Sequence, residues 1–280
     1  MATVITIGVQ KGGPGKTTTA HNLAAGLIEA GRRVLLIDAD PQGDLTTVTQ
    51  ADPDRPGLYE VLAREKDPAE CVQETPGGFS FMCSSPRLYS AGGEPDALKW
   101  ALAGIIGNYD FVVIDTPPAA VAYVSGICLE ASDLAIIPAL PSMLSAKGAV
   151  QYVQGIIGAV RAASNPDLKI AGVLVTAYSG RANVEKAALQ HLRETAEGIG
   201  TGMFSARIRR AAAVQEAEAL GESLFSYAPG AKVTEDYRAL AAEVMAAAGS
   251  GPGRVDRAAQ SMKAAAEESK GKGRRKNGKK

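Results

Sequence analysis

Residues 11–18 read Lys-Gly-Gly-Pro-Gly-Lys-Thr-Thr and closely follow the β-branched run 4–9. This order predicts a strand, a glycine-rich loop and then a helix. Glycine backbones approach an anion without a Cβ in the way, and successive N–H groups at a helix N-terminus cradle phosphates. We therefore expect a nucleoside triphosphate here, with Lys16 reaching its β- and γ-phosphates and the Thr17 hydroxyl on Mg²⁺.

The loop departs from the common pattern G-x-x-x-x-G-K-[ST] in one place. Gln10 stands where the first glycine belongs, and a second lysine, Lys11, comes next. Lys11 begins the loop, on the wrong side to reach its own nucleotide easily. We interpret it as a cation that contacts phosphates held by a second copy of the protein, as an arginine finger does in trans. The alternative is a solvated loop lysine.

Two later apolar runs end in carboxylates. Residues 34–37 lead to Asp38 and Asp40, and residues 111–114 lead to Asp115. Such runs predict buried parallel strands, whose carboxyl ends gather ligand-binding groups in open α/β sheets. Asp38 and Asp40 are two residues apart, so we expect them on one face of the strand end. Asp115 is placed to hold Mg²⁺, directly or through water, and the alternative is an aspartate that only forms a turn.

Taken together, three motifs resemble the ParA family of partition ATPases. They are the loop 11–18, Asp-Ala-Asp-Pro-Gln-Gly at 38–43 and Ile-Asp-Thr-Pro-Pro at 114–118. The family belongs to the deviant-Walker group of P-loop ATPases, with MinD and the nitrogenase iron protein as relatives, and the Asp-Pro-Gln-Gly element is similar to ParA rather than to either relative. The resemblance spans residues 1–248 and implies a doubly wound α/β fold, with a mostly parallel sheet and helices on both faces.

The resemblance also implies roles for individual residues. Lys11 corresponds to the lysine that contacts phosphate across an ATP-sandwich dimer, and Asp40 to the carboxylate that orients the attacking water. Asp115 corresponds to the Walker B residue, which with Thr17 would hold Mg²⁺. The catalytic residues would be Lys11, Lys16 and Asp40. The residues against ATP would be Lys11, Gly12, Gly13, Pro14, Gly15, Lys16, Thr17 and Thr18.

Composition limits the class of protein. Hydrophobic residues make up 46% of the chain and aromatic residues 5%, which predicts a sizeable core of Ala, Val, Leu and Ile. No uninterrupted apolar run reaches the about eighteen residues of a membrane span, and the first strand begins too early for a signal peptide. Cys71, Cys83 and Cys128 lack metal-ligand spacing. We expect a cytoplasmic protein that, by the resemblance, associates with the nucleoid.

The carboxyl-terminal segment differs in charge from the rest of the chain. After a Gly- and Pro-rich linker at 249–253, the tail 249–280 carries ten Lys and Arg against three Asp and Glu. Because the whole chain is neutral, residues 1–248 carry seven net negative charges. We expect a basic, largely disordered tail, with a weak helix over 255–266 and disorder over 270–280, that forms an arm for nucleic acid or another anionic surface. The alternatives are a solubilising tail and, since bulky apolar residues are few, less favourably a membrane anchor.

Three arginines are candidates for DNA contact. In the family that the chain resembles, the ATP dimer binds DNA without sequence preference. Arg207, Arg209 and Arg210 crowd the expected start of a helix over 209–220, where they could face phosphates. The alternative is a solvated charged face. No helix-turn-helix precedes the first strand, so we do not expect this chain to bind an operator sequence.

The predicted function follows from these motifs and the resemblance. We expect an ATPase that binds ATP and Mg²⁺, forms a homodimer with ATP, binds double-stranded DNA non-specifically and is released by slow hydrolysis that DNA and a ParB-like adaptor stimulate. An alternative is a ParA-like ATPase that positions a protein cargo, such as a carboxysome or a chemoreceptor cluster. A MinD-like membrane-cycling regulator is a further alternative. A metabolic P-loop kinase is disfavoured because it needs no second lysine at position 11.

Hydrophobic spacing and capping residues also predict the other elements. We expect helices over 16–30, 59–64, 95–106, 145–162, 184–197 and 234–247, the last with Thr234 as its N-cap, and further strands over 79–83, 135–137 and 170–176.

Overall fold

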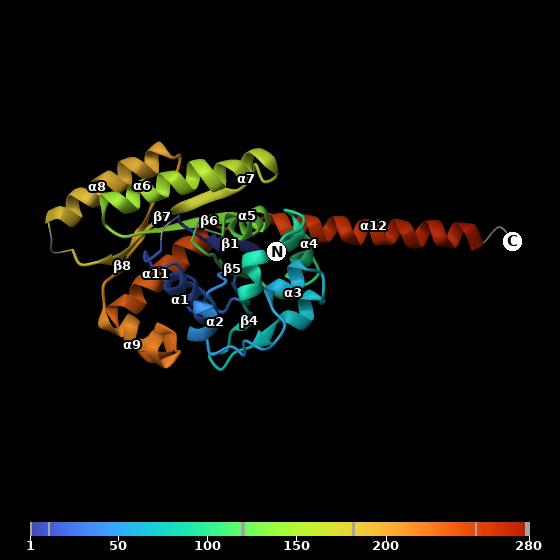
Figure 1. The fold of residues 1–280 in the computed structure, drawn as a ribbon, viewed down its shortest axis with the longest axis horizontal. Helices are drawn as coiled ribbons and strands as arrows, with labels where there is room; N and C mark the ends of the chain where they lie inside the picture. The colour runs from blue at the N-terminus through green and yellow to red at the C-terminus, as the bar shows by residue number, and fades with distance from the viewer. Residues whose placement is uncertain (1, 11, 119–120, 181–182, 250, 278–280) are drawn as a thin grey trace.

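An eight-stranded sheet forms the centre of the described chain (Figure 1). The computed structural model of the protein describes residues 2–10, 12–118, 121–180, 183–249 and 251–277, with the backbone alone at 183–184 and 268–277. The strand order is β3-β4-β2-β5-β1-β6-β7-β8, and every neighbouring pair is parallel except β3 and β4. The strands are β1 (Thr3–Ile7), β2 (Val34–Asp38), β3 (Gln73–Glu74), β4 (Ser80–Met82), β5 (Phe111–Asp115), β6 (Leu134–Ala139), β7 (Lys169–Tyr178) and β8 (Met203–Arg209).

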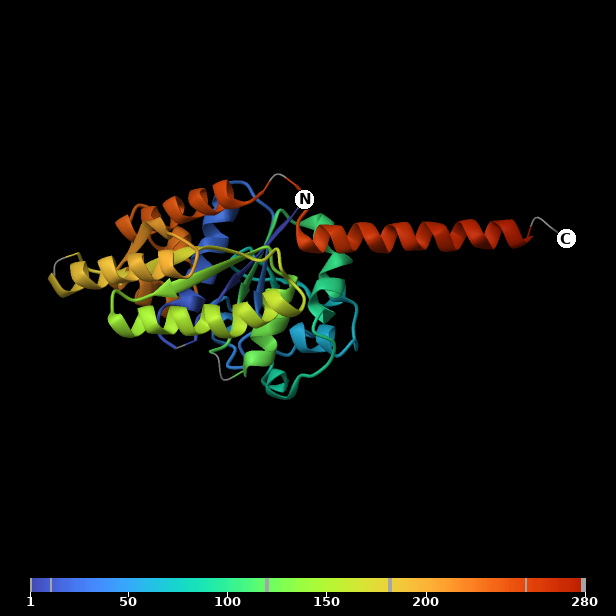
Figure 2. The ribbon, with the colours of Figure 1, turned by 90° about the horizontal axis from the view of Figure 1, so that it is seen from above.

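Helices connect the strands and cover both faces of the sheet (Figure 2). The α-helices are α1 (Lys16–Glu29), α2 (Asp44–Val48), α3 (Leu58–Leu62), α4 (Ala97–Ala103), α5 (Ala122–Ala131), α6 (Met143–Tyr152), α7 (Gly158–Ala163), α8 (Asn183–Gly198), α9 (Ala212–Leu220), α10 (Leu224–Tyr227), α11 (Lys232–Ala247) and α12 (Arg254–Asn277). Short 3₁₀ turns are η1 (Pro68–Cys71), η2 (Pro86–Ser90) and η3 (Ile106–Asn108), and η5 (Val153–Ile157) is one π-helical stretch.

Alternating side chains of the central strands pack into different apolar layers. On β1, Ile5 and Ile7 join a core with residues of α1 and α11, whereas Val4 joins the core under α4 and α5. A third core lies between β6, β7 and the helices α6 and α8. The sequences of these strands are continuously apolar because both faces of the strands are buried. The predicted doubly wound, mostly parallel α/β fold with helices on both faces is confirmed.

The sheet brings the polar strand ends together. Ile7, the last residue of β1, pairs with Asp115 on β5, and Asp38 on β2 pairs with the same Asp115. The glycine-rich loop follows β1 directly. The two acidic strand ends and the loop therefore meet at one edge of the sheet, which is where an open α/β sheet binds ligands.

Several expected elements differ from the structure. The helix expected over 95–106 is α4 alone, followed by the 3₁₀ turn η3, and the helix over 145–162 is interrupted by η5. Helix α11 begins at Lys232 with Ala231 as its N-cap, so Thr234 is not the cap. The Thr234 side chain is instead buried, where its hydroxyl donates to the Ala228 carbonyl at 2.6 Å.

The helix predicted over 209–220 is wrong at its start. Residues up to Arg209 belong to strand β8, and helix α9 begins only at Ala212. Phe204, Ala206 and Ile208 are buried and alternate with outward-facing residues, which is the period of two of a strand. Arg207 and Arg209 therefore lie on a strand and not at a helix start.

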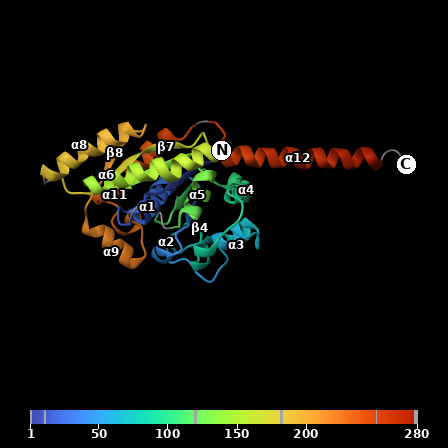
Figure 3. The same ribbon diagram turned by 45° about the horizontal axis from the view of Figure 1, so that its top comes forward.

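The tail is more regular than predicted, because its helix continues past the weak helix expected over 255–266 into residues from Lys270 that were expected to be disordered. Arg254–Asn277 form one helix, α12, which projects from the body beside α4 (Figures 1 and 3). Its first turns are part of the fold, because Val255 and Ala258 are buried in the core under α4. The Asp256 carboxylate accepts the backbone N–H of Ala2 at 2.9 Å. None of the helices within the described ranges has the length and apolar character of a membrane span.

The start of α12 is also held by buried charge. The Arg254 guanidinium pairs with Glu130, whose side chain is 2% exposed and which also pairs with Lys99 at 3.2 Å. The backbone N–H of Arg254 donates to Asp133 at 2.6 Å. Removing one partner of such a buried network leaves an uncompensated charge, so α12 is fastened to the body at its beginning.

Candidate nucleotide-binding site

The glycine-rich loop has the backbone that an anion cradle requires. Gly13 and Gly15 have φ values of 90° and 82°, in the left-handed region that favours glycine. Space above the loop is open, because a Cβ built at Gly12 or Gly13 would meet nothing within 4 Å. Helix α1 begins at Lys16 with Gly15 as its N-cap, which has no side chain to occupy the first N–H groups. These groups are thus available to phosphate oxygens.

Two threonines fasten this loop to later parts of the chain. The Thr176 hydroxyl on β7 donates to the Pro14 carbonyl at 2.8 Å. The Thr18 hydroxyl on α1 donates to the Glu218 carboxylate of α9 at 2.5 Å. Neither Thr176 nor Glu218 was expected at the site, and no local pattern marks them, since both act across more than 160 residues of chain.

Asp115 lies next to the first turn of α1. Its Oδ2 accepts the Thr17 hydroxyl at 2.7 Å, and its Oδ1 is buried without a hydrogen-bond partner in the described residues. Burial, followed by the charge of Asp38, raises the pKa of Asp115 to about 8, while the Thr17 bond and the charge of Lys16 act in the opposite direction. A buried carboxylate oxygen without a partner, beside a hydroxyl, is a suitable place for a cation.

The residues present fit Mg²⁺ held together with a substrate. Within the described ranges, no group of three or more His, Cys, Asp and Glu side chains is arranged to hold a metal by itself. Mg²⁺ usually keeps several waters and is bound through one or two protein oxygens plus substrate phosphates. The Asp115 carboxylate and the Thr17 hydroxyl are such oxygens, next to the loop that would hold the phosphates.

Asp38 and Asp40, which were expected on one face of the strand end, have different environments. Asp38 is fully buried; its Oδ1 accepts the Asp40 N–H at 3.0 Å, and its Oδ2 accepts the N–H and hydroxyl of Thr46, each at 2.8 Å. Burial raises the pKa of Asp38 to about 7. Asp38 therefore organises the loop that leads into α2, a structural role that the sequence pattern did not indicate.

Asp40 is held by that loop at the same edge of the sheet. One carboxylate oxygen accepts the Gln42 N–H at 3.1 Å, and the Asp40 carbonyl accepts the Ser84 hydroxyl at 2.5 Å. Asp40 is close enough to Asp115 for its charge to contribute to the raised pKa of Asp115. The structure thus brings Lys16, Thr17, Asp40 and Asp115 together, and Lys11 lies outside the described residues.

A cavity of about 660 Å³ opens beside the loop. The loop lines one side of it through Gly13, Pro14, Gly15 and Thr18. The other sides come from the ends of β6, β7 and β8, the start of α9 and one side chain of α11: Leu140, Thr176, Ala177, Ile208, Arg209, Arg210, Ala211, Ala212, Val214, Gln215 and Tyr237. Its size is within the range of small-molecule sites.

The three arginines do not form one patch of free cations. Arg209 makes two hydrogen bonds of 2.6 Å to Asp236 on α11, so its charge is paired. The Arg207 guanidinium lies 5.6 Å from the centre of the Tyr178 ring. Arg210 is exposed, lines the cavity beside the loop and forms no ion pair with another described residue.

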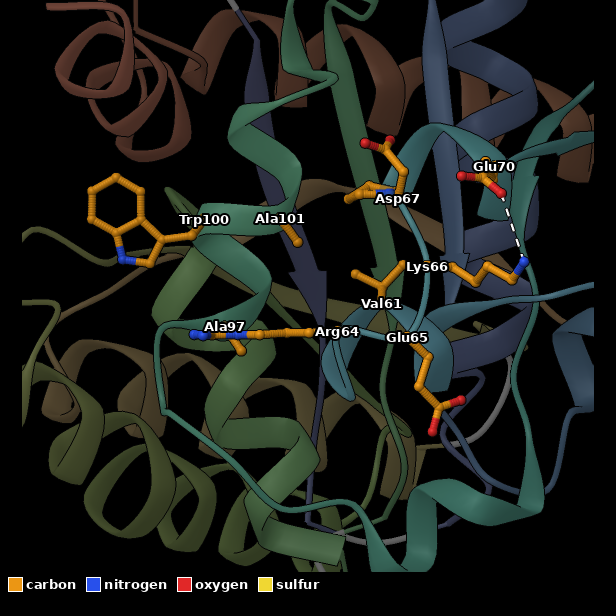
Figure 4. Close-up of a pocket in the computed structure, with 10 residues that line it drawn as sticks. Val61, Arg64, Glu65, Lys66, Asp67, Glu70, Ala97, Trp100 and Ala101 are labelled. Atoms are coloured by element: carbon orange, nitrogen blue, oxygen red, sulfur yellow. Dashed lines mark ion pairs between the residues drawn. The ribbon is translucent and has the colours of Figure 1, made fainter. Parts of the chain in front are cut away.

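A second cavity, of about 590 Å³, lies between α3, η1 and α4 (Figure 4). Arg64 and Trp100 line it, and Lys66 and Glu70 at its edge form an ion pair of 3.8 Å. Of the residues at the glycine-rich loop and the acidic strand ends, none that the structure describes lines this cavity. It is therefore separate from the nucleotide site.

Comparison with known proteins identifies the family. The family described as AAA domain matches residues 2–170. The chain is 36% identical over 246 residues to the chromosome-partitioning ATPase Soj of Thermus thermophilus, covering 86% of this chain and 95% of that protein. This chain belongs to the ParA/Soj family of ATPases. It is also 32% identical over 257 residues to the sporulation initiation inhibitor protein Soj of Bacillus subtilis, covering 88% of this chain and 99% of the relative.

A solved structure shares the fold of this ParA/Soj ATPase. Cobyrinic acid a,c-diamide synthase of Mycobacterium smegmatis, with a bound ATP analog and magnesium, is 30% identical, covers 88% of this chain and 94% of its own, and has a TM-score of 0.75. The resemblance to ParA, drawn from three short motifs, is confirmed by the identity to the two Soj proteins.

Proposed function

We propose that this ParA/Soj ATPase is a DNA-partition protein. It binds ATP and Mg²⁺, associates in pairs through the bound nucleotide, binds nucleoid DNA without sequence preference, and is released when a ParB-like adaptor stimulates hydrolysis. The observation that carries the proposal is the Thr17–Asp115 contact at the mouth of the glycine-rich loop, in a chain 36% identical to a chromosome-partitioning ATPase. The cargo would be a plasmid or a chromosome.

Each site residue has a defined task in hydrolysis. The loop N–H groups of residues 12–15 and the buried Lys16 hold the phosphates, and Thr17 with Asp115 holds Mg²⁺. When bound, Mg²⁺ neutralises charge on the phosphate oxygens. Asp40, fixed by the bonds of its loop, orients the attacking water. Most of the catalysis is then positioning of groups and stabilisation of charge.

The cavity beside the loop would take the nucleoside. It begins at the residues that cradle the phosphates and extends between the ends of the last strands and α9. Apolar side chains such as Leu140 and Val214 would cover the faces of the base, and backbone polar groups would contact its edge. The later strands of the sheet would in this way supply the adenine contacts.

Pairing of two copies would occur at the nucleotide edge of the sheet. Lys11 at the start of the loop would contact the phosphates held by the partner. Three large side chains near this edge are exposed: Tyr89 by 56%, Met143 by 59% and Leu144 by 66%. Tyr89 follows β4, and Met143 and Leu144 follow β6, two strands whose carboxyl ends form this edge. Exposed apolar side chains beside a charged site favour an interface between proteins. ATP would then control the affinity for DNA through the association state.

DNA contact would use Arg210 and the basic end of α12. Arg209 is engaged by Asp236 and is less available to phosphates than the sequence suggested. The last third of α12 contains five bases and no acid, namely Lys270, Lys272, Arg274, Arg275 and Lys276. A helix that is fastened to the body at one end and basic at the other can present this charge to a phosphate backbone.

The decisive experiment measures binding to a duplex of arbitrary sequence with ATP, ADP or no nucleotide, at two salt concentrations. We expect tight binding with ATP alone, and weaker binding at the higher salt concentration. Equal binding in the three nucleotide states would contradict the proposal. Sedimentation with anionic vesicles and ATP, in place of DNA binding, would favour a membrane-cycling regulator.

A further inference from the structure

Tyr152 on α6 occupies the space where Gly8 would carry a side chain. A Cβ built at Gly8 would overlap the Tyr152 hydroxyl, and it would lie 2.7 Å from Cζ of Tyr152 and 3.1 Å from the Thr116 hydroxyl. The φ of Gly8 is not in the left-handed region, so its backbone does not require glycine. Glycine is needed at position 8 because the tyrosine fills the space.

The placement of the tyrosine is constrained on both sides. Tyr152 is only 1% exposed, and its hydroxyl lies beside the Thr116 hydroxyl, which donates its own proton to the Ile7 carbonyl and can accept that of the tyrosine. Glycine at position 8 costs stability through chain entropy. Rules of local stability are broken most often at functional sites.

The contact lies at the base of the nucleotide site. Gly8 is the first residue after β1 and begins the segment that rises into the glycine-rich loop. Thr116 directly follows Asp115, and its hydroxyl donates to the Ile7 carbonyl at 2.8 Å. The Tyr152 side chain therefore touches both the approach to the loop and the residue after Asp115.

Helix α6 has an irregularity directly after the tyrosine. The α-helical stretch ends at Tyr152, and the π-helical turn η5 (Val153–Ile157) follows. π-Helical turns inside helices are frequent at functional sites. Two independent features, the glycine at 8 and the turn after 152, thus accompany the placement of one hydroxyl.

We propose that Tyr152 is a positioning residue for ATP hydrolysis, which sets the glycine-rich loop and the Asp115–Thr116 strand end at the spacing that the reaction needs. The hydroxyl does so by filling the space between Gly8 and Thr116. This inference rests on the proposed ATPase site. It adds to that site a residue from α6, 136 positions after Lys16.

The first test replaces Tyr152 by Phe, which removes a single oxygen atom. We expect kcat to fall about tenfold with KM changed less than about threefold, because small misplacements of catalytic groups act mainly on the chemical step. The midpoint of thermal unfolding should fall only slightly, since Phe keeps the buried ring and loses one hydrogen bond. A tyrosine with a purely structural role would lower the midpoint and leave kcat unchanged.

Tyr109→Phe is the matched control, because Tyr109 lies just before the amino end of β5, whereas Asp115 is at the carboxyl end of that strand. It loses the same atom and should keep the kcat of the parent. If the parent hydrolyses ATP and Tyr152→Phe has the same kcat, the positioning role is refuted. If the parent itself binds and hydrolyses no ATP, the proposed function fails first and the inference falls with it.

A second test uses the steric relationship between the two residues. Gly8→Ala should abolish ATP binding, measured with a fluorescent ATP analogue, because the new Cβ displaces the loop or the tyrosine. Adding Tyr152→Phe should restore little, since Cζ remains 2.7 Å from that Cβ, whereas adding Tyr152→Leu should restore binding substantially. Normal ATP binding and kcat in Gly8→Ala alone would overturn the inference.

Discussion

The Thr17 hydroxyl donates a 2.7 Å hydrogen bond to the Oδ2 of Asp115, which joins the first turn of α1 to the last residue of β5. The two residues are 98 positions apart in the chain. Their contact places a hydroxyl, a carboxylate and the buried Lys16 at one point of the sheet edge. Changes at that point should act on nucleotide binding and hydrolysis, and changes farther out should act on DNA binding.

Lys16→Ala should abolish ATP binding. Lys16 is buried at the start of α1, directly after the loop that would hold the phosphates, and no other cation among the described loop residues can replace it. Isothermal titration with ATP and Mg²⁺ measures the effect, and we expect affinity to fall at least about 100-fold. Lys169→Ala, an exposed lysine at the start of β7, is the control. Tight binding by the Lys16 variant would disprove the site.

Asp40→Ala should still bind ATP and pair, but turn over slowly. Removing a group that orients the attacking water leaves phosphate binding intact and costs about 100-fold in kcat. Phosphate release measures turnover, and light scattering measures pairing. Asp54→Ala, in an exposed loop, should behave as the parent. Turnover at the parental rate would show that a residue other than Asp40 orients the attacking water.

Arg210→Glu should weaken DNA binding more than Arg209→Glu does. Arg209 is paired with Asp236, so its reversal breaks an ion pair at the protein surface and lowers stability slightly, whereas the exposed Arg210 is available to phosphates. DNA affinity with ATP and the thermal unfolding midpoint separate the two effects. Because both arginines line the cavity proposed for the nucleoside, ATP affinity is measured for both variants, and DNA affinity is compared at saturating ATP. A stronger effect on DNA affinity at Arg209 would contradict this ranking.

Two truncations of the tail should behave differently. Ending the chain after Ala266 removes the basic end of α12 but keeps its anchored first turns, so stability should not change. The salt slope of DNA binding should fall by about 0.9 for each phosphate that the tail neutralises. Ending it after Gly249 also removes Arg254 and leaves Glu130 with one cation fewer, so stability should fall too. An unchanged salt slope in the chain that ends at Ala266 would exclude the tail from DNA contact.

His21 should contribute a destabilising term in mild acid. Burial lowers the pKa of His21 from 6.5 to about 4, so this residue stays neutral in the fold, where its ring lies 5.1 Å from Phe79. Below pH 6.5 the unfolded chain takes up a proton that the folded chain does not. The contribution of His21 to the free energy of unfolding should therefore fall by about 1.4 kcal/mol per pH unit between pH 6.5 and 4, whereas the raised pKa values of Asp38 and Asp115 contribute in the opposite direction.

His21→Gln should remove that part of the pH dependence, because glutamine does not titrate. Urea unfolding of both proteins at several pH values compares their slopes. Above pH 7 the difference in stability between them should be constant. Parallel curves from pH 7 to pH 4 would show that His21 is not the group responsible.

The sequence alone determined the strand–loop–helix unit, the two acidic strand ends and the family. Each depends on a pattern that is local in the chain: glycines before Lys16, and apolar runs that end at Asp38 and Asp115. Local patterns can be recognised because backbone freedom and strand burial restrict the residues at adjacent positions. The alternation of Phe204, Ala206 and Ile208 was also present, but the nearby arginines and the later helical spacing obscured it.

The tertiary structure decided which groups meet across the chain. Four contacts join segments that are 27 to 200 residues apart. They are Thr18 with Glu218, Arg209 with Asp236, Arg254 with Glu130, and Gly8 with Tyr152. The amino-acid sequence carries no local signal for such pairs, because burial and long-range packing select them. The same reason applies to α12, whose composition is that of a solvated tail but whose first turns gain buried contacts from α4 and the start of β1.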